Sequence, residues 1–255
     1  MNMLPKTDIL GVGITAASED KILEFILNNL QKPKGKRDKI VIFTPNPEQI
    51  SAAFSNPQLK NLLNQAQIAL PDGVGVAIGA RILGKPIYAR ITGIDFMKSL
   101  VKSISKEPVN TGYFGGQPHV AERASQCLAK MYPGLRVKYA SDTYDKEKMM
   151  HFDIDILFVG LGFPKQEEWI VANKSKIPAS VIMAVGGSLD FLSGKIPRAP
   201  KLMQKIGLEW AFRLALQPQR FFRQLRIWHF GGLILSEALG NHLKRIKNQE
   251  SRIKS

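Results

Sequence analysis

Short apolar runs alternate with amphipathic stretches along most of this chain, and each run ends at a turn that contains glycine or proline. Strands are predicted by the runs at 9–14, 39–43, 67–70, 109–114, 135–140, 154–159 and 180–185. Helices are predicted between them at 19–30, 57–66, 96–105, 118–131 and 166–173. Asn46 followed by Pro47 resembles the N-cap and first residue of a further helix. Strands that alternate with helices at this spacing form right-handed crossovers in a mostly parallel sheet. The pattern therefore predicts an α/β fold that is Rossmann-like, with helices flanking the sheet.

The C-terminal segment differs from the rest of the chain in charge and composition. Residues 195–255 contain thirteen Lys and Arg against three Glu, so they hold ten of the fifteen net positive charges. Two prolines within 196–200 indicate a change of direction, and the sequence beyond them is helical in composition with a break at Pro218. We therefore predict an α/β domain over 1–195 and a basic amphipathic helical appendage over 196–255.

The sequence disfavours disulfides, membrane spans and metal sites. The single cysteine, Cys127, excludes an intrachain disulfide and is typical of a reducing, cytosolic compartment. The N-terminus lacks a signal-peptide pattern, and no run of about 18 apolar residues predicts a membrane span. The four histidines lack metal-ligand spacing. Asp153-Ile154-Asp155 resembles the Asp-x-Asp of metal-dependent nucleotide-sugar enzymes. It lies at the N-terminal end of its predicted strand, away from the edge of the sheet where ligands bind. These observations disfavour a metal site.

Four turns follow predicted strands and should meet at one edge of the sheet. They are Thr44-Pro45-Asn46, Pro71-Asp72-Gly73, Gly115-Gly116-Gln117 and Gly160-Leu161-Gly162. Ligands of open parallel sheets bind at this edge. Glycine turns let backbone N–H groups approach a phosphate, and the helix N-terminus that follows adds partial positive charge. The four turns together predict a nucleotide or phosphate ligand.

Asp72 is an acid in one of these turns, directly after the apolar run at 68–70. Carboxylates are rarely buried without a partner, so packing explains its position poorly. A second polar cluster, formed by Arg90, Thr92 and Asp95, follows along the chain. We interpret Asp72 as a catalytic base.

Common nucleotide and nucleophile motifs are absent. Gly11-Val12-Gly13 and Gly160-Leu161-Gly162 lack the third glycine of the dinucleotide fingerprint, which disfavours an oxidoreductase, and no glycine loop ends in the Gly-Lys-Ser/Thr of a P-loop. Gly187-Ser188 lacks the nucleophile-elbow pattern and is expected to lack its strand-turn-helix context. A basic nucleic-acid-binding α/β protein remains the alternative, because the C-terminal arginines and aromatic residues suit phosphate contacts and base stacking. That alternative leaves the four turns unexplained.

Taken in order, six motifs make the chain resemble the WecG/TagA/CpsF glycosyltransferase family over roughly 10–234. They are Thr44–Gln49, Pro71–Gly75, Arg90–Asp95, Gly112–Gly116, Val159–Glu168 and Val185–Gly194, with Ile196–Pro200 as the usual continuation. The resemblance implies a metal-independent, inverting hexosyltransferase that uses a UDP-sugar as a substrate and needs no cofactor. Its acceptor would be a polyprenyl-diphosphate-linked sugar in cell-envelope polysaccharide or teichoic acid linkage-unit synthesis. N-acetylmannosamine or a related hexose is the expected sugar, no nucleic acid is implied, and a homo-oligomer stays open.

The resemblance also implies roles for individual residues. The acid of the Pro-Asp-Gly turn, Asp72, corresponds to the proposed general base of the family. Matching catalytic positions near it are Thr44 and Asn46 as polar neighbours, Arg90 near the donor phosphates, and Gln166 as a polar group at the site. Expected substrate contacts are Gly73, Thr92, Asp95, Gly115, Gly162, Lys165, Gly187 and the nucleotide-binding position Asp190.

Three arginines of the appendage complete the expected site. The resemblance suggests that Arg213, Arg220 and Arg223 close over the site and meet the diphosphate. At about 100° per residue they fall within roughly 80° of one another on a continuous helix, a register that Pro218 would interrupt. Basic residues at an anionic membrane surface contribute about 1 kcal/mol each. The appendage is therefore expected to hold a cytoplasmic protein peripherally at the inner face of the cell membrane.

Overall fold

The computed structural model describes residues 3–253, apart from the side chains of Lys146, Lys205, Arg220, Phe222, Gln224 and 244–253. Its strands are β1 Lys6–Ile9, β2 Val12–Thr15, β3 Ile40–Phe43, β4 Ile68–Ala69, β5 Asn110–Gly115, β6 Arg136–Ser141, β7 Ile156–Gly160 and β8 Val181–Ala184. Its first helices are α1 Glu19–Gln31, α2 Pro47–Phe54, α3 Pro57–Leu63, α4 Val74–Ile82, α5 Gly93–Ile104 and α6 Val120–Met131. The later helices are α7 Lys146–His151, α8 Lys165–Asn173, α9 Ser188–Leu192, α10 Lys201–Lys205, α11 Glu209–Leu216 and α12 Phe221–Ile253. Short 3-10 turns lie at Lys34–Lys36 and Pro218–Arg220.

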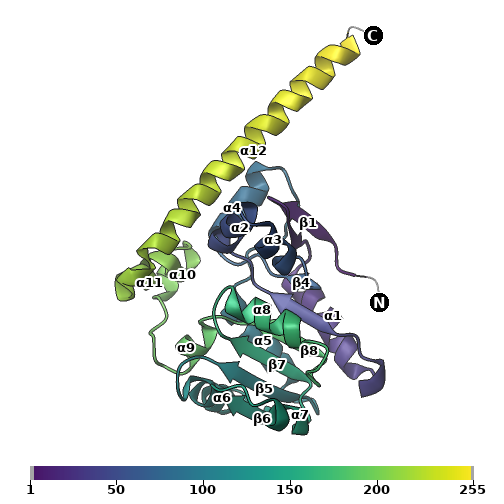
Figure 1. Ribbon diagram of the computed structural model, residues 1–255, viewed down its shortest axis with the longest axis vertical. Helices are drawn as coiled ribbons and strands as arrows, with labels where there is room; N and C mark the ends of the chain where they lie inside the picture. The colour runs from purple at the N-terminus through teal and green to yellow at the C-terminus, as the bar shows by residue number, and fades with distance from the viewer. Residues whose placement is uncertain (1–2, 254–255) are drawn as a thin grey trace.

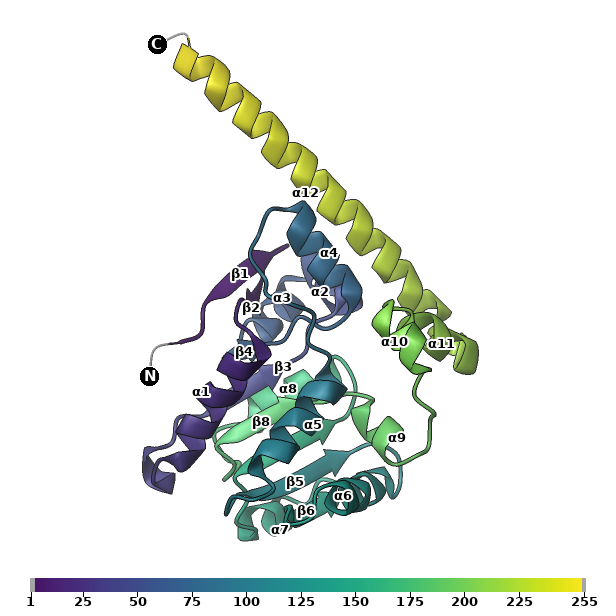
Figure 2. The same ribbon diagram turned by 180° about the vertical axis from the view of Figure 1, so that it is seen from behind.

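Six strands form a parallel sheet in the order β4-β3-β8-β7-β5-β6. Helices α1, α5 and α6 cover one face (Figure 2), where Ile22, Leu100 and Leu128 enter a buried core. On the other face, α2 and α8 place Ile50 and Ile170 in a second buried core (Figure 1). The predicted α/β class, with a parallel sheet flanked by helices, is therefore confirmed.

The predicted strand at 9–14 is instead a turn between two short strands. β1 and β2 pair antiparallel outside the main sheet. The chain reverses at Leu10 and Gly11, whose φ angles of 54° and 85° lie in the left-handed region that glycine tolerates. The side chain of Asn64 holds the turn, donating to Gly11 O and accepting from Gly13 N, both at 2.9 Å. The apolar pattern hides this reversal because the apolar residues on both sides of it are buried.

Three helices, α4, α7 and α9, were not predicted. The stretch that forms α4 has four valine or isoleucine residues and two glycines, which gives it little helical character in sequence. α9 has five residues, too few to show a helical period, yet it follows β8 after a turn. The prediction that Gly187-Ser188 lacks a strand-turn-helix context is therefore wrong.

The helices α10, α11 and α12 form the basic C-terminal segment, and Pro218 lies at the predicted break. Figure 1 shows α12 running beside α2 and α4, with its C-terminal part projecting from the body. Phe230 and Ile234 are buried against Gly79, where a Cβ atom would lie 3.1 Å and 3.0 Å from their side chains. These α12 residues share the second buried core with residues of the body. The domain boundary after residue 195 stays a prediction. Within 3–253, no helix is both long and apolar enough to cross a membrane.

Candidate active site

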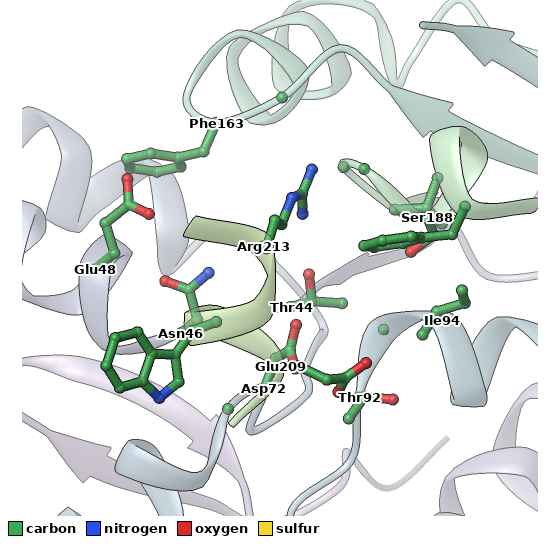
Figure 3. A pocket seen from close by; sticks show the side chains of 18 of the residues that line it. Thr44, Asn46, Glu48, Asp72, Thr92, Ile94, Phe163, Ser188, Glu209 and Arg213 are labelled. Atoms are coloured by element: carbon green, nitrogen blue, oxygen red, sulfur yellow. The ribbon is translucent and has the colours of Figure 1, made fainter. Parts of the chain in front are cut away.

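A cavity of about 630 Å³ lies between the carboxyl edge of the sheet and the helices α11 and α12. The turns after β3, β4, β5, β7 and β8 all contribute to its wall. The predicted meeting of four of them at one edge, those after β3, β4, β5 and β7, is therefore observed. Figure 3 shows side chains from the body and from the C-terminal helices pointing into the same space. The sheet and the appendage thus build this cavity together.

Most of the predicted site residues line this cavity. They are Thr44, Asn46, Asp72, Gly73, Arg90, Thr92, Gly162, Gln166, Gly187, Asp190, Arg213 and Arg223. Gly115, Lys165 and Asp95 are not among the lining residues, and the side chain of Arg220 lies outside the described part of the chain. Lining residues that sequence reasoning missed include Glu48, Phe191, Glu209 and Trp210. A carboxylate in a first helical turn, as at Glu48 and Glu209, has an ordinary structural explanation in sequence and so gives no distinct signal.

Asp72 lies in the turn between β4 and α4, with its side chain half-buried in the cavity wall. Its backbone N–H donates to Pro45 O at 3.1 Å, which ties this turn to the neighbouring one. Burial raises the pKa of the Asp72 carboxyl to about 6, opposed by the charge of Arg90 and supported by that of Glu209. The backbone N–H of Gly73 also acts to lower the pKa. A carboxyl group with this pKa can accept a proton near neutral pH.

Asn46 and Thr44 lie beside Asp72 in the cavity (Figure 3). Asn46 caps α2: its Oδ1 accepts from Gln49 N at 3.0 Å, while Gln49 Oε1 accepts from Asn46 N at 3.2 Å. This reciprocal cap fixes the Asn46 side chain at the cavity edge. Thr44 is buried against Gly93, where a Cβ atom would lie 3.1 Å from Thr44 Cγ2.

Arg90 has partners from the appendage in this structure. Its Nη2 donates to Glu209 Oε2 at 2.7 Å, and its Nη1 donates to the carbonyl oxygen of Gln204 at 2.9 Å. The guanidinium of Arg90 lies at the cavity wall, next to the acid of α11. Its location near a donor phosphate stays a prediction.

Thr92 and Asp95 have structural partners. Thr92 caps α5, and its Oγ1 accepts from Asp95 N at 3.3 Å. The carboxylate of Asp95 accepts from both Nη groups of Arg198, at 2.6 Å and 2.7 Å. Asp95 therefore anchors the segment that leads into the appendage, whereas the sequence predicted a substrate contact for it.

Gln166 and Glu167 form a buried pair in the first turn of α8. Gln166 Oε1 accepts from Gly186 N at 2.9 Å, and its Nε2 donates to Glu167 Oε1 at 2.9 Å. Burial raises the pKa of Glu167 to about 7. The hydrogen bonds to Glu167 and Gly186 fix which way the Gln166 amide points in the cavity wall.

Two arginines enter the cavity from either side of the turn at Pro218. Arg213 of α11 lies over Phe191, with Cζ 5.1 Å from the ring centroid. Arg223 of α12 donates through Nε to Glu48 Oε1 at 2.6 Å. The helix is not continuous between them, so the single helical face considered in the sequence does not form, yet both side chains line the cavity.

Gly187 leaves room for the guanidinium of Arg213. A Cβ atom at position 187 would lie 3.0 Å from Arg213 Cζ and closer still to Nη2. Burial lowers the pKa of Arg213, an effect that the charge of Asp190 opposes. The cavity thus holds a cation beside a glycine turn, an arrangement suited to a diphosphate.

Comparison with known proteins shows which family the chain is similar to. The profile described as "Glycosyl transferase WecG/TagA/CpsF family" matches residues 7–244. An N-acetylglucosaminyldiphosphoundecaprenol N-acetyl-beta-D-mannosaminyltransferase of Bacillus spizizenii is 34% identical over 192 residues, 73% of this chain and 75% of that protein. A protein of the same name from Staphylococcus aureus is 31% identical over 224 residues, 86% of this chain and 87% of that protein.

Within 3–253, no group of three or more His, Cys, Asp or Glu side chains could hold a metal ion.

Proposed function

Because the chain belongs to the WecG/TagA/CpsF glycosyltransferase family, we propose that it transfers N-acetylmannosamine from a UDP-sugar to N-acetylglucosamine on an undecaprenyl diphosphate. The two relatives carry this acceptor and this sugar in their names. The transfer inverts the anomeric centre and needs neither a metal nor a cofactor. The product would be a linkage unit for teichoic acid or another cell-envelope polysaccharide.

The observation that carries the proposal is the position of Asp72 in the cavity, with a pKa of about 6. At neutral pH its carboxylate is free to remove the proton from the acceptor hydroxyl. The hydroxyl oxygen then forms a bond to the anomeric carbon, and the bond from that carbon to UDP breaks. The electron pair leaves on the β-phosphate oxygen, and attack from the opposite face inverts the centre.

The departing UDP needs positive charge where its negative charge develops. Arg213 and Arg223 line the cavity and supply guanidinium groups, which match phosphate oxygens in shape as well as charge. The turn at Gly186-Gly187 allows a close approach to the backbone. We assign the donor diphosphate to this part of the cavity, opposite Asp72.

The appendage gives a physical basis for lipid acceptor binding. Large apolar side chains are exposed on α12: Leu225, Trp228, Leu235, Leu239 and Leu243. Basic residues accompany them in the sequence of the appendage. This combination favours an anionic membrane surface, so we propose peripheral attachment at the inner face of the cell membrane.

A direct transfer assay tests the function. Purified protein, UDP-N-acetylmannosamine and a synthetic lipid-diphosphate N-acetylglucosamine should give UDP and a lipid-linked disaccharide, with EDTA present. Thermal stabilisation by UDP should accompany turnover, since a ligand that binds the folded state stabilises it. If UDP neither stabilises the protein nor appears as a product with any UDP-hexose, the proposed function is wrong.

The pH dependence of kcat/KM should report Asp72 in the free enzyme. Because the pKa of this carboxyl is about 6, the rate should be constant at higher pH and fall about tenfold per unit below pH 6. The Glu167→Gln variant removes the other acid with a raised pKa, so the midpoint near pH 6 should persist in its profile. A midpoint near pH 4 in both proteins would contradict the role of Asp72.

A methyl group at position 187 should displace Arg213. The Gly187→Ala variant places a Cβ atom in contact with the guanidinium, and such a displacement should lower kcat on the order of 10²-fold. Gly232→Ala is the matched control, because nothing lies within 4 Å of a Cβ at that helical glycine. Equal rates for the two variants would show that Arg213 need not occupy its place over Gly187.

A further inference from the structure

A series of ion pairs joins the appendage to the body along one wall of the cavity. Glu209, the first residue of α11, accepts from Arg90 Nη2 at 2.7 Å and from Arg198 Nε at 3.0 Å. Arg198 in turn holds both oxygens of Asp95. One carboxylate therefore connects an arginine of the body to an arginine of the segment before α10.

The ion pair between Glu209 and Arg90 is partly shielded from solvent. Its side chain is 23% exposed and that of Arg90 is 21% exposed, so solvent and salt screen their attraction less than on an open surface. The Nε of Arg90 is buried without a hydrogen-bond partner among the described residues. The guanidinium consequently depends on its Nη contacts, of which Glu209 supplies the charged one.

The same helix carries cavity residues further along. Trp210 follows Glu209 directly, and Arg213 lies one turn later; all three line the cavity. The position of Glu209 against Arg90 therefore sets where this turn of α11 lies relative to Asp72. Figure 3 shows Glu209 beside Asp72, with Arg213 reaching into the cavity from the same helix.

We propose that Glu209 is a positioning residue of the transfer reaction: by holding Arg90 and Arg198, its carboxylate fixes α11 over the cavity and keeps a negative charge beside Asp72. This inference rests on the proposed function, because Glu209 acts on the reaction through Asp72 and Arg213. The geometry gives it two consequences, one for the placement of Arg213 and one for the proton affinity of Asp72.

The electrostatic consequence has a definite sign. Among the described residues, the charged side chains that act on Asp72 include Arg90, Glu209 and Arg213. The charge of Glu209 raises the pKa of Asp72, whereas that of Arg90 lowers it. A neutral side chain at 209 would remove the repulsion and leave the charge of Arg90 uncompensated. The loss of this repulsion lowers the pKa of Asp72, so the base would stay ionised at a lower pH.

The test compares pH–rate profiles of Glu209→Gln and wild-type protein in the transfer assay. The variant should lose on the order of 10²-fold in its plateau kcat, because Arg213 is no longer held in place. The low-pH midpoint, at which the rate falls to half of its plateau, should also lie at a lower pH in the variant than in the wild type. A residue that merely braces the fold would lower the plateau and leave the midpoint where it was.

Two further variants give the comparison its controls. Glu209→Asp keeps the charge, so its midpoint should stay near that of the wild type even if its plateau falls. Glu237→Gln removes a different appendage carboxylate, paired with Lys85 at 2.9 Å and not among the cavity residues, and should leave both readouts unchanged. A Glu209→Gln profile with an unmoved midpoint overturns the inference, whatever its plateau. If instead UDP neither stabilises the wild-type protein nor forms from any UDP-hexose, the proposed function itself fails.

Discussion

The Asp72→Asn variant is expected to lose kcat by roughly 10²- to 10⁴-fold, the range that a positioned general base contributes. The amide has nearly the shape of the carboxyl group but cannot take the proton of the acceptor hydroxyl. UDP affinity should stay near the wild-type value, because the donor diphosphate is assigned to the opposite part of the cavity. Single-turnover transfer and UDP titration by calorimetry separate the two effects.

The same variant should be at least as stable as the wild type. Burial raises the pKa of Asp72 to about 6 in the folded chain, above the value of about 4 for an exposed aspartate. The folded state therefore binds the proton more tightly, and its stability falls as the pH rises from about 4 to about 6. A neutral side chain avoids this loss. Tm at pH 7 should equal or exceed that of the wild type, and the difference should vanish below about pH 4.

Asp20→Asn is a suitable control for this experiment, because Asp20 is an exposed acid on α1, remote from the cavity residues. It should keep wild-type transfer. An Asp72→Asn variant that transfers at a wild-type rate would show that another group removes the proton. A variant that loses both activity and UDP affinity would place Asp72 in donor binding instead.

The sequence predicts those parts of the site that depend on local chain geometry. Asp72 is recognisable because a turn after an apolar run, at the carboxyl end of a parallel strand, is a place where packing does not require an acid. Asn46 before Pro47 predicts the helix cap that the structure contains. These features need only a few neighbouring residues to form, so their pattern is visible in a single chain.

The partners across the cavity could not be predicted in the same way. Arg90 and Glu209 are 119 residues apart, and nothing near either of them specifies the other. Glu209 looks like an ordinary acid in a first helical turn, and Asp95 looks like a free polar group until the fold brings Arg198 to it. Long-range ion pairs follow from how α11 packs on the body, which residue spacing does not encode.

Short elements set a similar limit on the fold. The reversal at Leu10-Gly11 is hidden inside a run of buried residues, so the pattern of apolar positions reads as one strand. The helices α7 and α9 have six and five residues, fewer than two turns, and leave no clear period. The longer strands and helices were predicted because burial repeats in them over enough residues to be recognised.

The Arg213→Ala variant is the second change with a large expected effect. The guanidinium of Arg213 lies over Phe191 and against Gly187, inside the cavity, where it can take up charge on the departing UDP. Removing a preorganised donor of this kind typically costs about 10²- to 10³-fold in kcat. Arg213→Lys should recover little of the rate, because an ammonium group lacks the planar fork that matches two phosphate oxygens.

Arg226→Ala separates this effect from a general loss of positive charge. Arg226 is exposed on α12 and is not among the cavity residues, although it belongs to the same basic segment. With a water-soluble acceptor, where membrane binding has no influence, Arg226→Ala should keep wild-type kcat while Arg213→Ala stays impaired. With acceptor in anionic vesicles, Arg226→Ala should weaken vesicle binding, by about 1 kcal/mol for one basic residue. Wild-type kcat for both variants with the soluble acceptor would mean that the appendage arginines act only through the membrane, and the proposed role of Arg213 at the leaving diphosphate would be wrong.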